Sequence, residues 1–155
     1  MYKRQTIRRA TVADAALITK QRHLMFAENQ LATEERLETM DAEFEAWVLE
    51  RLADERYVGF LAEAEGVVLA GAGIFFMDFP PHFLHIEPMR PYLLNFYTAP
   101  EARGQGLANV LLDTCVGECR KRGAKAVTLH ASPFGKPIYE RYGFTKHNEM
   151  ILKLE

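Results

Sequence analysis

The chain has 155 residues, a formal net charge of −2 and 48% hydrophobic residues, which suits one domain with its own core and leaves no room for a second. Interspersed charges without a basic stripe argue against a nucleic-acid partner, and no apolar run approaches the ~18 residues that span a bilayer. No apolar signal segment follows Met1, so we expect a cytoplasmic protein without a membrane partner.

The first third of the chain predicts a short strand and two helices. The strand is expected near residues 5–8, and Thr11 can cap a first helix that runs to about Leu24. The second helix is predicted from apolar residues that recur at three- and four-residue steps, namely Leu37, Met40, Phe44, Trp47, Val48 and Leu52.

The middle of the chain predicts strands. Residues 57–63 and 67–76 flank the polar link Ala64-Glu65-Gly66 and indicate an antiparallel hairpin. The next strand is expected over residues 92–98. The connection 77–91 has four prolines, which deny backbone donors, so we expect no regular element there. A loop of this length is either functional or a surface excursion or dimer contact.

A glycine-rich stretch, Arg103-Gly104-Gln105-Gly106-Leu107-Ala108, joins the strand at 92–98 to an amphipathic helix. Two glycines allow the backbone to pass close to a ligand, and the first turn of the helix presents unpaired N–H groups beside them. The stretch therefore predicts an anion site, with a phosphate as its natural occupant.

Two common phosphate loops do not match this stretch. A nucleotide P-loop ends in Gly-Lys-Ser/Thr, whereas Gly106 is followed by Leu107 and Ala108. A dinucleotide loop needs a third small residue and an acidic residue about 20 positions later, but Asn109 takes the glycine place and residues 121–125 are basic. A nucleotide-binding switch is therefore disfavoured.

The last third predicts a helix, a strand, a short helix and a final strand. Gly123 can end the helix that follows the glycine stretch. A strand over 125–131 is expected to pair in parallel beside 92–98. Pro137 suits the start of a short helix that runs through Tyr142, and residues 145–154 alternate as a half-buried strand does. The fold class predicted is mixed α/β.

The glycine stretch resembles the acyl-CoA pyrophosphate loop of the GCN5-related N-acetyltransferase (GNAT) superfamily, Arg/Gln-x-x-Gly-x-Gly/Ala, which Arg103, Gly106 and Ala108 meet. Residues 95–101 are similar to that family's fourth strand and the following turn, residues 138–144 to its aromatic-Gly-Phe end segment, and residues 7–14 to its first strand and helix start. The resemblance covers essentially the whole chain.

The resemblance implies a single GNAT-like domain over residues 1–155, with a mixed central sheet, antiparallel N-terminal strands and a splayed parallel pair flanked by helices. It implies an acetyl-CoA-dependent N-acetyltransferase that acts without a metal on a primary amine of a small molecule or a peptide. A noncatalytic acyl-CoA sensor is the alternative. A homodimer is a further expectation, because dimers are common in the family.

The resemblance also assigns site residues. Phe96, Tyr97 and Thr98 would line the pantetheine arm, and the backbone of Arg103, Gly104, Gln105, Gly106, Leu107 and Ala108 would hold the pyrophosphate. Arg103 either pairs with a phosphate or is an ordinary turn arginine. A bulge in the fourth strand would free the N–H of Phe96 or Tyr97 to stabilise an oxyanion.

Tyr139 matches the family tyrosine near the thioester sulfur and is the expected general acid, with Tyr142 as the second candidate. The general base is not assigned. The predicted strand carries Asn95 where a glutamate could have accepted the proton, and an asparagine cannot take one. The candidates are Glu28, which we favour weakly together with a water relay, and Asp78, His82, His85 and Glu87. Cys115 and Cys119 are expected to be packing residues rather than a nucleophile or a metal pair.

Overall fold

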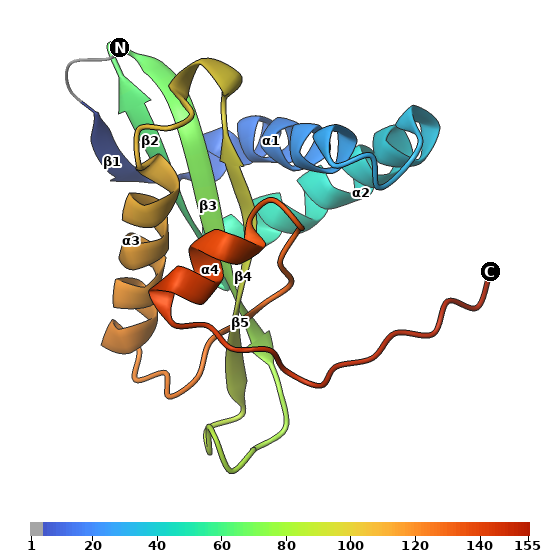
Figure 1. The fold of residues 1–155 in the computed structure, drawn as a ribbon, viewed down its shortest axis with the longest axis vertical. Coiled ribbons are helices and arrows are strands. Elements are labelled where there is room, and N and C mark those ends of the chain that lie inside the picture. Colours follow the sequence, from blue (N-terminus) through green and yellow to red (C-terminus); the bar gives the residue numbers. More distant parts are fainter. Residues whose placement is uncertain (1–4) are drawn as a thin grey trace.

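The computed structural model describes residues 5–155 and has a mixed five-stranded sheet at its centre (Figure 1). Neighbouring strands are antiparallel except for β4 and β5, which are parallel. The mixed sheet with antiparallel N-terminal strands is the predicted fold class. In the spatial order of the sheet the strands are β1 (Thr6–Arg9), β2 (Tyr57–Ala64), β3 (Val67–Asp78), β4 (Met89–Thr98) and β5 (Thr128–Leu129).

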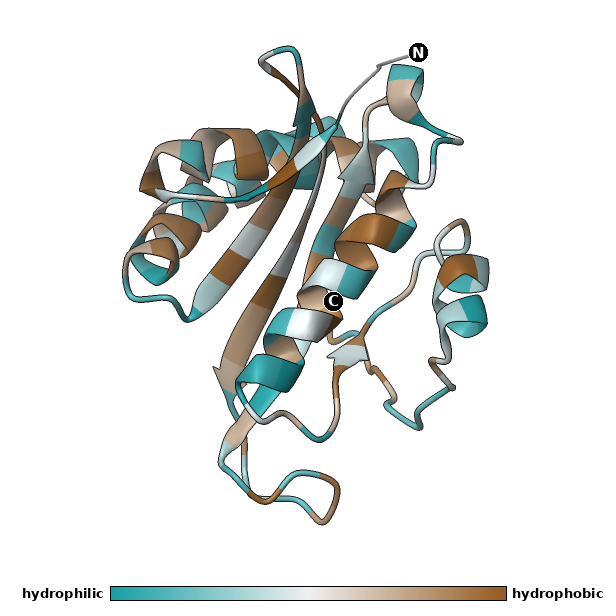
Figure 2. Ribbon diagram, turned by 90° about the vertical axis from the view of Figure 1, so that its left-hand side faces the viewer, coloured by the Kyte–Doolittle hydropathy of each residue, from teal (hydrophilic) through white to brown (hydrophobic). Residues whose placement is uncertain are grey.

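Four helices cover the two faces of the sheet. The pair α1 (Ala15–Glu28) and α2 (Glu34–Ala53) lies on one face, and α3 (Leu107–Lys121) with the short α4 (Lys136–Tyr142) lies on the other (Figure 1). In the view of Figure 2 the strands between these layers are predominantly apolar. Burial on both faces explains why β2 and β3 read as nearly continuous apolar runs.

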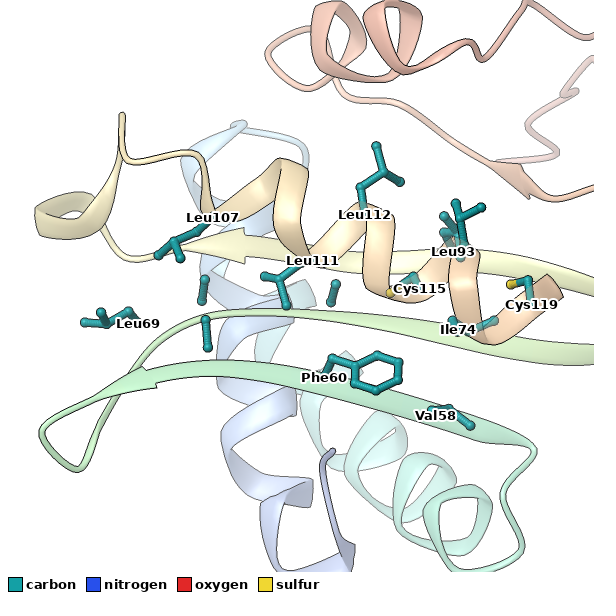
Figure 3. Close-up of a cluster of buried hydrophobic side chains, with 14 of the residues drawn as sticks. Val58, Phe60, Leu69, Ile74, Leu93, Leu107, Leu111, Leu112, Cys115 and Cys119 are labelled. Carbon is teal, nitrogen blue, oxygen red and sulfur yellow. The ribbon is translucent and has the colours of Figure 1, made fainter. Parts of the chain in front are cut away.

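Each face has its own hydrophobic cluster. On the α3 face, Leu111, Leu112 and Cys115 belong to the same buried cluster as Ile74 and Leu93 of the sheet (Figure 3). On the other face, residues of α1 and α2 pack around Tyr57. Both cysteines are buried, and burial raises the pKa of each thiol, that of Cys119 to about 12. The prediction that the two cysteines serve as packing residues is confirmed.

The helix starts are fixed by caps. Thr11 accepts a hydrogen bond from the Ala13 N–H at 3.3 Å, and the Asp14 carboxylate accepts one from the Thr11 N–H at 2.8 Å. The first helix continues to Glu28, one turn beyond the predicted Leu24, because no breaker precedes Asn29. Thr33 caps α2 through the Arg36 N–H.

The proline-rich connection is shorter than predicted. Strand β3 extends to Asp78 and β4 begins at Met89, so only residues 79–88 form the loop. Pro91 lies inside β4 and pairs with Phe76. A proline is tolerated there because pairing with β5 begins only at Tyr92, so no ladder bond is lost on that side.

Of the two strands predicted at the end of the chain, one is shorter than predicted and the other is absent. The strand expected over 125–131 is reduced to Thr128–Leu129, and residues 145–154 form no strand at all. A strand exists only when a neighbouring edge provides its hydrogen bonds, and residues 145–154 pair with no strand of the described chain, although β5 has one free edge. The N-terminal stretch in which we found no signal segment begins with residues 1–4, and these four residues lie outside the described part of the chain.

Candidate functional site

An opening forms where β4 and β5 part. The two strands pair only at Tyr92 with Thr128 and at Leu93 with Leu129. Beyond these pairs β4 continues to Thr98 with β3 on one side and no strand on the other, within the part of the chain that the structure describes. The splayed parallel pair expected from the family resemblance is therefore present, and its open edge offers free backbone groups to a ligand.

A β-bulge lies on β4 beside this opening. Tyr97 pairs with Gly71 and Leu94 pairs with Gly73, so Asn95 and Phe96 together oppose the single residue between the two glycines. Asn95 has a φ of 61°, in the left-handed region that asparagine tolerates better than most residues. The bulge interrupts the ladder at the residues where the oxyanion donor is expected.

Two side chains hold Asn95 in this conformation. Its Nδ2 donates to the Tyr57 hydroxyl at 3.0 Å, and its Oδ1 accepts from Nη1 of Arg22 at 2.8 Å. The asparagine is buried, burial raises the pKa of Tyr57, and burial lowers the pKa of Arg22. Gly73 leaves room for the tyrosine, because a Cβ there would lie 2.0 Å from the hydroxyl.

The glycine-rich stretch forms a tight turn into α3. Gly104 and Gly106 have φ values of 80° and 79°, where a side chain is strained, and a Cβ on either would meet no atom within 4 Å. Gly106 is the N-cap of α3, and no side chain bonds to the first turn. The turn is anchored by the buried Ala102 and Leu107. It therefore presents helix N–H groups to open space, as an anion site requires.

Arg103 connects the turn to α1 and β4. Its Nε donates to the Thr98 carbonyl at 2.9 Å, its Nη2 pairs with the Glu28 carboxylate at 2.7 Å, and its guanidinium lies 5.8 Å from the Tyr97 ring centroid. Four residues singled out from the sequence thus meet at one end of β4. Gln105, by contrast, accepts a hydrogen bond from Gln5 at 2.8 Å.

Tyr139 lies on α4 beside the opening. Its ring packs edge-on against the bulge residue Phe96, with 5.7 Å between centroids, and against Phe144. Burial raises the pKa of Tyr139 to about 12, so the hydroxyl stays protonated at neutral pH. The Tyr142 hydroxyl instead donates to Asp113 at 2.9 Å. Of the two tyrosines, only Tyr139 contacts β4 at the bulge.

The other predicted base candidates lie elsewhere. Asp78, His82, His85 and Glu87 belong to or flank the 79–88 loop, at the opposite end of β4 from the glycine turn (Figure 1). Asn95 is six residues along β4 from Met89, which corresponds to about 20 Å of extended chain. These four side chains are therefore remote from the bulge.

His130 is a titratable residue that the sequence analysis missed. It directly follows β5, where the strands part, and its side chain is 62% exposed. Its Nδ1 contacts the Tyr92 hydroxyl and its Nε2 contacts the Glu149 carboxylate. The signal available in the sequence was a histidine at the end of a short predicted strand, which pointed to no particular partner.

Neither a metal centre nor a membrane span is found in the described part of the chain. Residues 5–155 contain no group of three or more His, Cys, Asp or Glu side chains that could hold a metal ion. No helix among these residues is long and apolar enough to cross a bilayer.

Comparisons with known proteins agree with this geometry. The acetyltransferase (GNAT) domain family model matches residues 19–153. A GCN5-related N-acetyltransferase from Ralstonia eutropha JMP134 is 33% identical, with 97% of this chain and 99% of that chain covered and a TM-score of 0.93. That alignment leaves out only about 3% of this chain, fewer residues than 145–155 contains, so it includes part of the C-terminal segment. No curated protein matches the sequence.

Two further crystal structures are similar. A predicted acetyltransferase from Clostridium acetobutylicum, solved with acetyl-CoA, is 30% identical over 98% of this chain and 96% of that chain, with a TM-score of 0.89. A glucosamine-6-phosphate N-acetyltransferase from Arabidopsis thaliana shares the fold at 20% identity, over 97% and 98% of the two chains, with a TM-score of 0.67. The chain therefore belongs to the GCN5-related N-acetyltransferase (GNAT) family of acyltransferases.

Proposed function

We propose that this acetyltransferase takes the acetyl group of acetyl-CoA and transfers it to a primary amine of a small molecule or a peptide by direct attack. The observation that carries the proposal is the bulge at Asn95, which interrupts the β4 ladder at the splayed edge and lies between the glycine turn and Tyr139. A donor thioester needs these three features along one edge.

The donor would lie along β4. Phe96, Tyr97 and Thr98 would line the pantetheine arm, which would bond to the free edge of the strand as an added strand does. The N–H groups of Arg103 to Ala108 would hold the pyrophosphate, with the N-terminus of α3 supplying the favourable field. Arg103 would keep Thr98 in place from the side.

The reaction needs three groups. The amine attacks the thioester carbonyl, and the N–H of Phe96 or Tyr97 stabilises the oxyanion of the tetrahedral intermediate. Collapse of that intermediate breaks the carbon–sulfur bond, and the Tyr139 hydroxyl donates its proton to the leaving thiolate. Before the attack the acceptor ammonium must lose one proton to a base, either directly or through water. The nitrogen of the intermediate then loses a second proton, which balances the proton that Tyr139 gives to the thiolate.

We propose His130 as the leading base, with Glu28 as the second candidate. The imidazole of His130 lies at the point where the strands part, and its ring nitrogens contact the Tyr92 hydroxyl and the Glu149 carboxylate. The Glu28 carboxylate is already engaged by Arg103, whose Nη2 lies 2.7 Å away. The variants H130Q and E28Q separate the two, because only the true base variant loses the acidic limb of the pH–rate profile.

Thermal unfolding with and without acetyl-CoA tests donor binding, with ATP as the control. A ligand of the native state at about 100 times its dissociation constant adds roughly 2.7 kcal/mol of stability. We expect a rise in Tm with acetyl-CoA and none with ATP. An unchanged Tm at saturating acetyl-CoA would contradict the proposed donor site.

Screening amines by release of the CoA thiol then tests the reaction itself. Turnover with any primary amine supports the transferase, whereas binding of acetyl-CoA without turnover on a broad amine panel supports the noncatalytic sensor. We further propose a cytoplasmic location, because two free, buried cysteines suit a reducing compartment.

A further inference from the structure

Arg22 of α1 is a half-buried cation that has no counter-ion among residues 5–155. Its only hydrogen bond within these residues runs from Nη1 to the Asn95 Oδ1 at 2.8 Å. Burial lowers the pKa of Arg22, and only the nearby Tyr57 and Tyr92 oppose this shift. A desolvated charge is stabilised when an opposite charge lies beside it. The site is therefore suited to an anion from outside the chain.

The unused edge of this guanidinium can take a carboxylate. Asn95 occupies Nη1, whereas in the described part of the chain no acceptor bonds to Nη2, and Nε is buried without a partner. The Nε–H and Nη2–H bonds of an arginine point the same way and form a fork that matches the two oxygens of a carboxylate. The rings of Phe26 and Phe44 each have their centroid 4.8 Å from the central carbon of the guanidinium. This stacking fixes the direction of the fork.

Arg22 lines a cavity of about 480 Å³ between α1 and α2. The α2 residues that line it are the apolar Met40, Phe44, Ala46 and Trp47 and the charged Glu43, Glu50 and Arg51. Both of these carboxylates are exposed, and that of Glu50 pairs with Arg56 at 3.3 Å. Arg51 is stacked on the Trp47 ring and donates to the Trp47 carbonyl at 3.1 Å. A ligand in the cavity would therefore meet apolar walls and the free fork of Arg22.

The face of β4 that carries Arg22 is the one from which an amine can approach the donor. Asn95 directs its side chain to Arg22 and α1, whereas the next residue, Phe96, packs its ring against Tyr139 of α4. The two helices lie on opposite faces of the sheet (Figure 1). In the proposed reaction the leaving thiolate and its acid occupy the α4 side, which leaves the α1 side to the acceptor.

The proposed base borders the same side. Tyr92 lies close enough to Arg22 to raise the pKa of its guanidinium, and the Tyr92 hydroxyl contacts His130. Only the side chain of Asn95 separates the guanidinium from the backbone of the bulge. An anionic group bound at Arg22 would therefore be a few bonds away from an amine that attacks at the bulge.

We propose that the acceptor is an amine that also carries a carboxylate, as a free amino acid does, and that Arg22 binds this carboxylate and selects for it. The inference rests on the proposed acetyl transfer and names the class of its acceptor. The products would be an N-acetyl amino acid and the CoA thiol. An apolar side chain on the amino acid would fill the cavity against Phe44 and Trp47.

The fluorescence of Trp47 measures binding of the acceptor without turnover. Trp47 is the only tryptophan of the chain and lines the same cavity as Arg22. Phenylalanine and phenylalaninamide are the first pair of ligands, followed by other amino acids and their amides. We expect the acid to bind about 10–100-fold more tightly than the amide, as a charge-assisted hydrogen bond allows. Arg22→Met should abolish this preference, whereas Arg36→Met, which removes a charge from an exposed position of α2, should keep it.

Steady-state kinetics separate the carboxylate contact from the support that Arg22 gives to Asn95. A relaxed bulge would lower kcat/KM for phenylalanine and for its amide alike, whereas a lost carboxylate contact lowers only the first. We therefore expect the ratio of the two values to fall about 10–100-fold in Arg22→Met. The fall should be smaller in Arg22→Lys, which keeps a cation but not the fork, and absent in Arg36→Met.

The proposal would be overturned if no acid in the panel bound more tightly than its amide, or if the preference survived in Arg22→Met. Carboxylate-dependent binding that Arg22→Met abolishes, without turnover of any amine, would support the contact and contradict the proposed transfer. Turnover of amines that does not depend on a carboxylate would support the transfer and contradict the contact.

Discussion

At the scale of single residues, Tyr139 has the most specific proposed role. Replacing it by phenylalanine keeps the ring that packs on Phe96 and Phe144 and removes only the hydroxyl. We expect turnover to fall about 10²–10⁴-fold, the usual contribution of a general acid, while the rise in Tm with acetyl-CoA is retained. The matched control is Tyr142→Phe, because that hydroxyl is bonded to Asp113. Equal turnover in the two variants would contradict the assignment.

Alanine variants of Gly106 and Gly117 test the glycine turn, with Gly117 as the control. Both are glycines of the α3 region whose added Cβ would meet no atom within 4 Å, but only Gly106 has a positive φ. Gly106→Ala should cost about 1–2 kcal/mol in the free energy of unfolding and weaken acetyl-CoA binding. Gly117→Ala, in a helix interior, should add about 0.5–1 kcal/mol and leave binding unchanged. Chemical denaturation and titration of the ligand measure both effects.

Single residues also differ in how far sequence alone could place them. The glycine turn was predictable because it needs a positive φ at two positions, and glycine, which adopts a positive φ readily, stands at both of them. Tyr139 was recognised through a motif; the structure places its ring against Phe96, and its role as general acid stays a prediction. The position of Asn95 was not predictable, because its conformation depends on Arg22 and Tyr57, which lie 73 and 38 positions away. His130 was missed for a similar reason, since its neighbours come from β4 and the C-terminal segment.

At the scale of elements, the bulge in β4 depends on the Tyr57 hydroxyl. Tyr57→Phe leaves the buried Nδ2 of Asn95 without its acceptor, and an unsatisfied buried donor costs about 1–3 kcal/mol. We expect a loss of stability in that range and a larger proportional loss of turnover than of acetyl-CoA binding, because the bulge would relax. Urea unfolding and steady-state kinetics measure these effects. Full turnover with lowered stability would show that the bulge does not position the oxyanion donor.

The packing of α1 on α2 carries a pH dependence. His23 on α1 lies 2.6 Å from the Asp41 carboxylate and 2.8 Å from that of Glu34, and the hydrogen bond to Asp41 is the main cause of its raised pKa. A raised folded-state pKa stabilises the fold fully below the unfolded value near 6.5, and this stabilisation is lost as the pH rises through the folded value.

The free energy of unfolding should therefore decline between about pH 6 and pH 8. His23→Gln should flatten that decline, whereas His147→Gln, in the exposed C-terminal segment, should leave it unchanged. Denaturation curves at several pH values measure the slope. A slope that survives in His23→Gln would assign the pH dependence to another group.

Elements were predictable where their cause was local. The cap at Thr11, the apolar stripe of α2 and the hairpin of β2 and β3 all follow from neighbouring residues. The final strand failed as a prediction although its alternation was correctly seen. Alternation indicates which side chains a strand would bury, but the strand itself exists only when a second edge provides its hydrogen bonds. Residues 145–154 pair with no strand of the described chain.

At the scale of the whole molecule, the segment 145–155 is separable from the fold. Both core clusters and their packed neighbours end at Phe144, so a chain truncated after Thr145 should keep its core and most of its intrinsic stability. If the segment joins two copies, the full-length chain gains stability by mass action, and its Tm rises with protein concentration. The truncated chain should have a Tm that does not depend on concentration.

Calorimetry of both chains over a hundredfold range of concentration measures this difference. At the lowest concentrations the two Tm values should converge, because the dissociated full-length chain contains the same core as the truncated one. A full-length Tm that stays higher by a constant amount at every concentration would place the stabilising contacts of the segment within its own chain. Since the segment contacts His130 at the open end of the site, a concentration-dependent Tm would also make the surroundings of that histidine depend on the dimer.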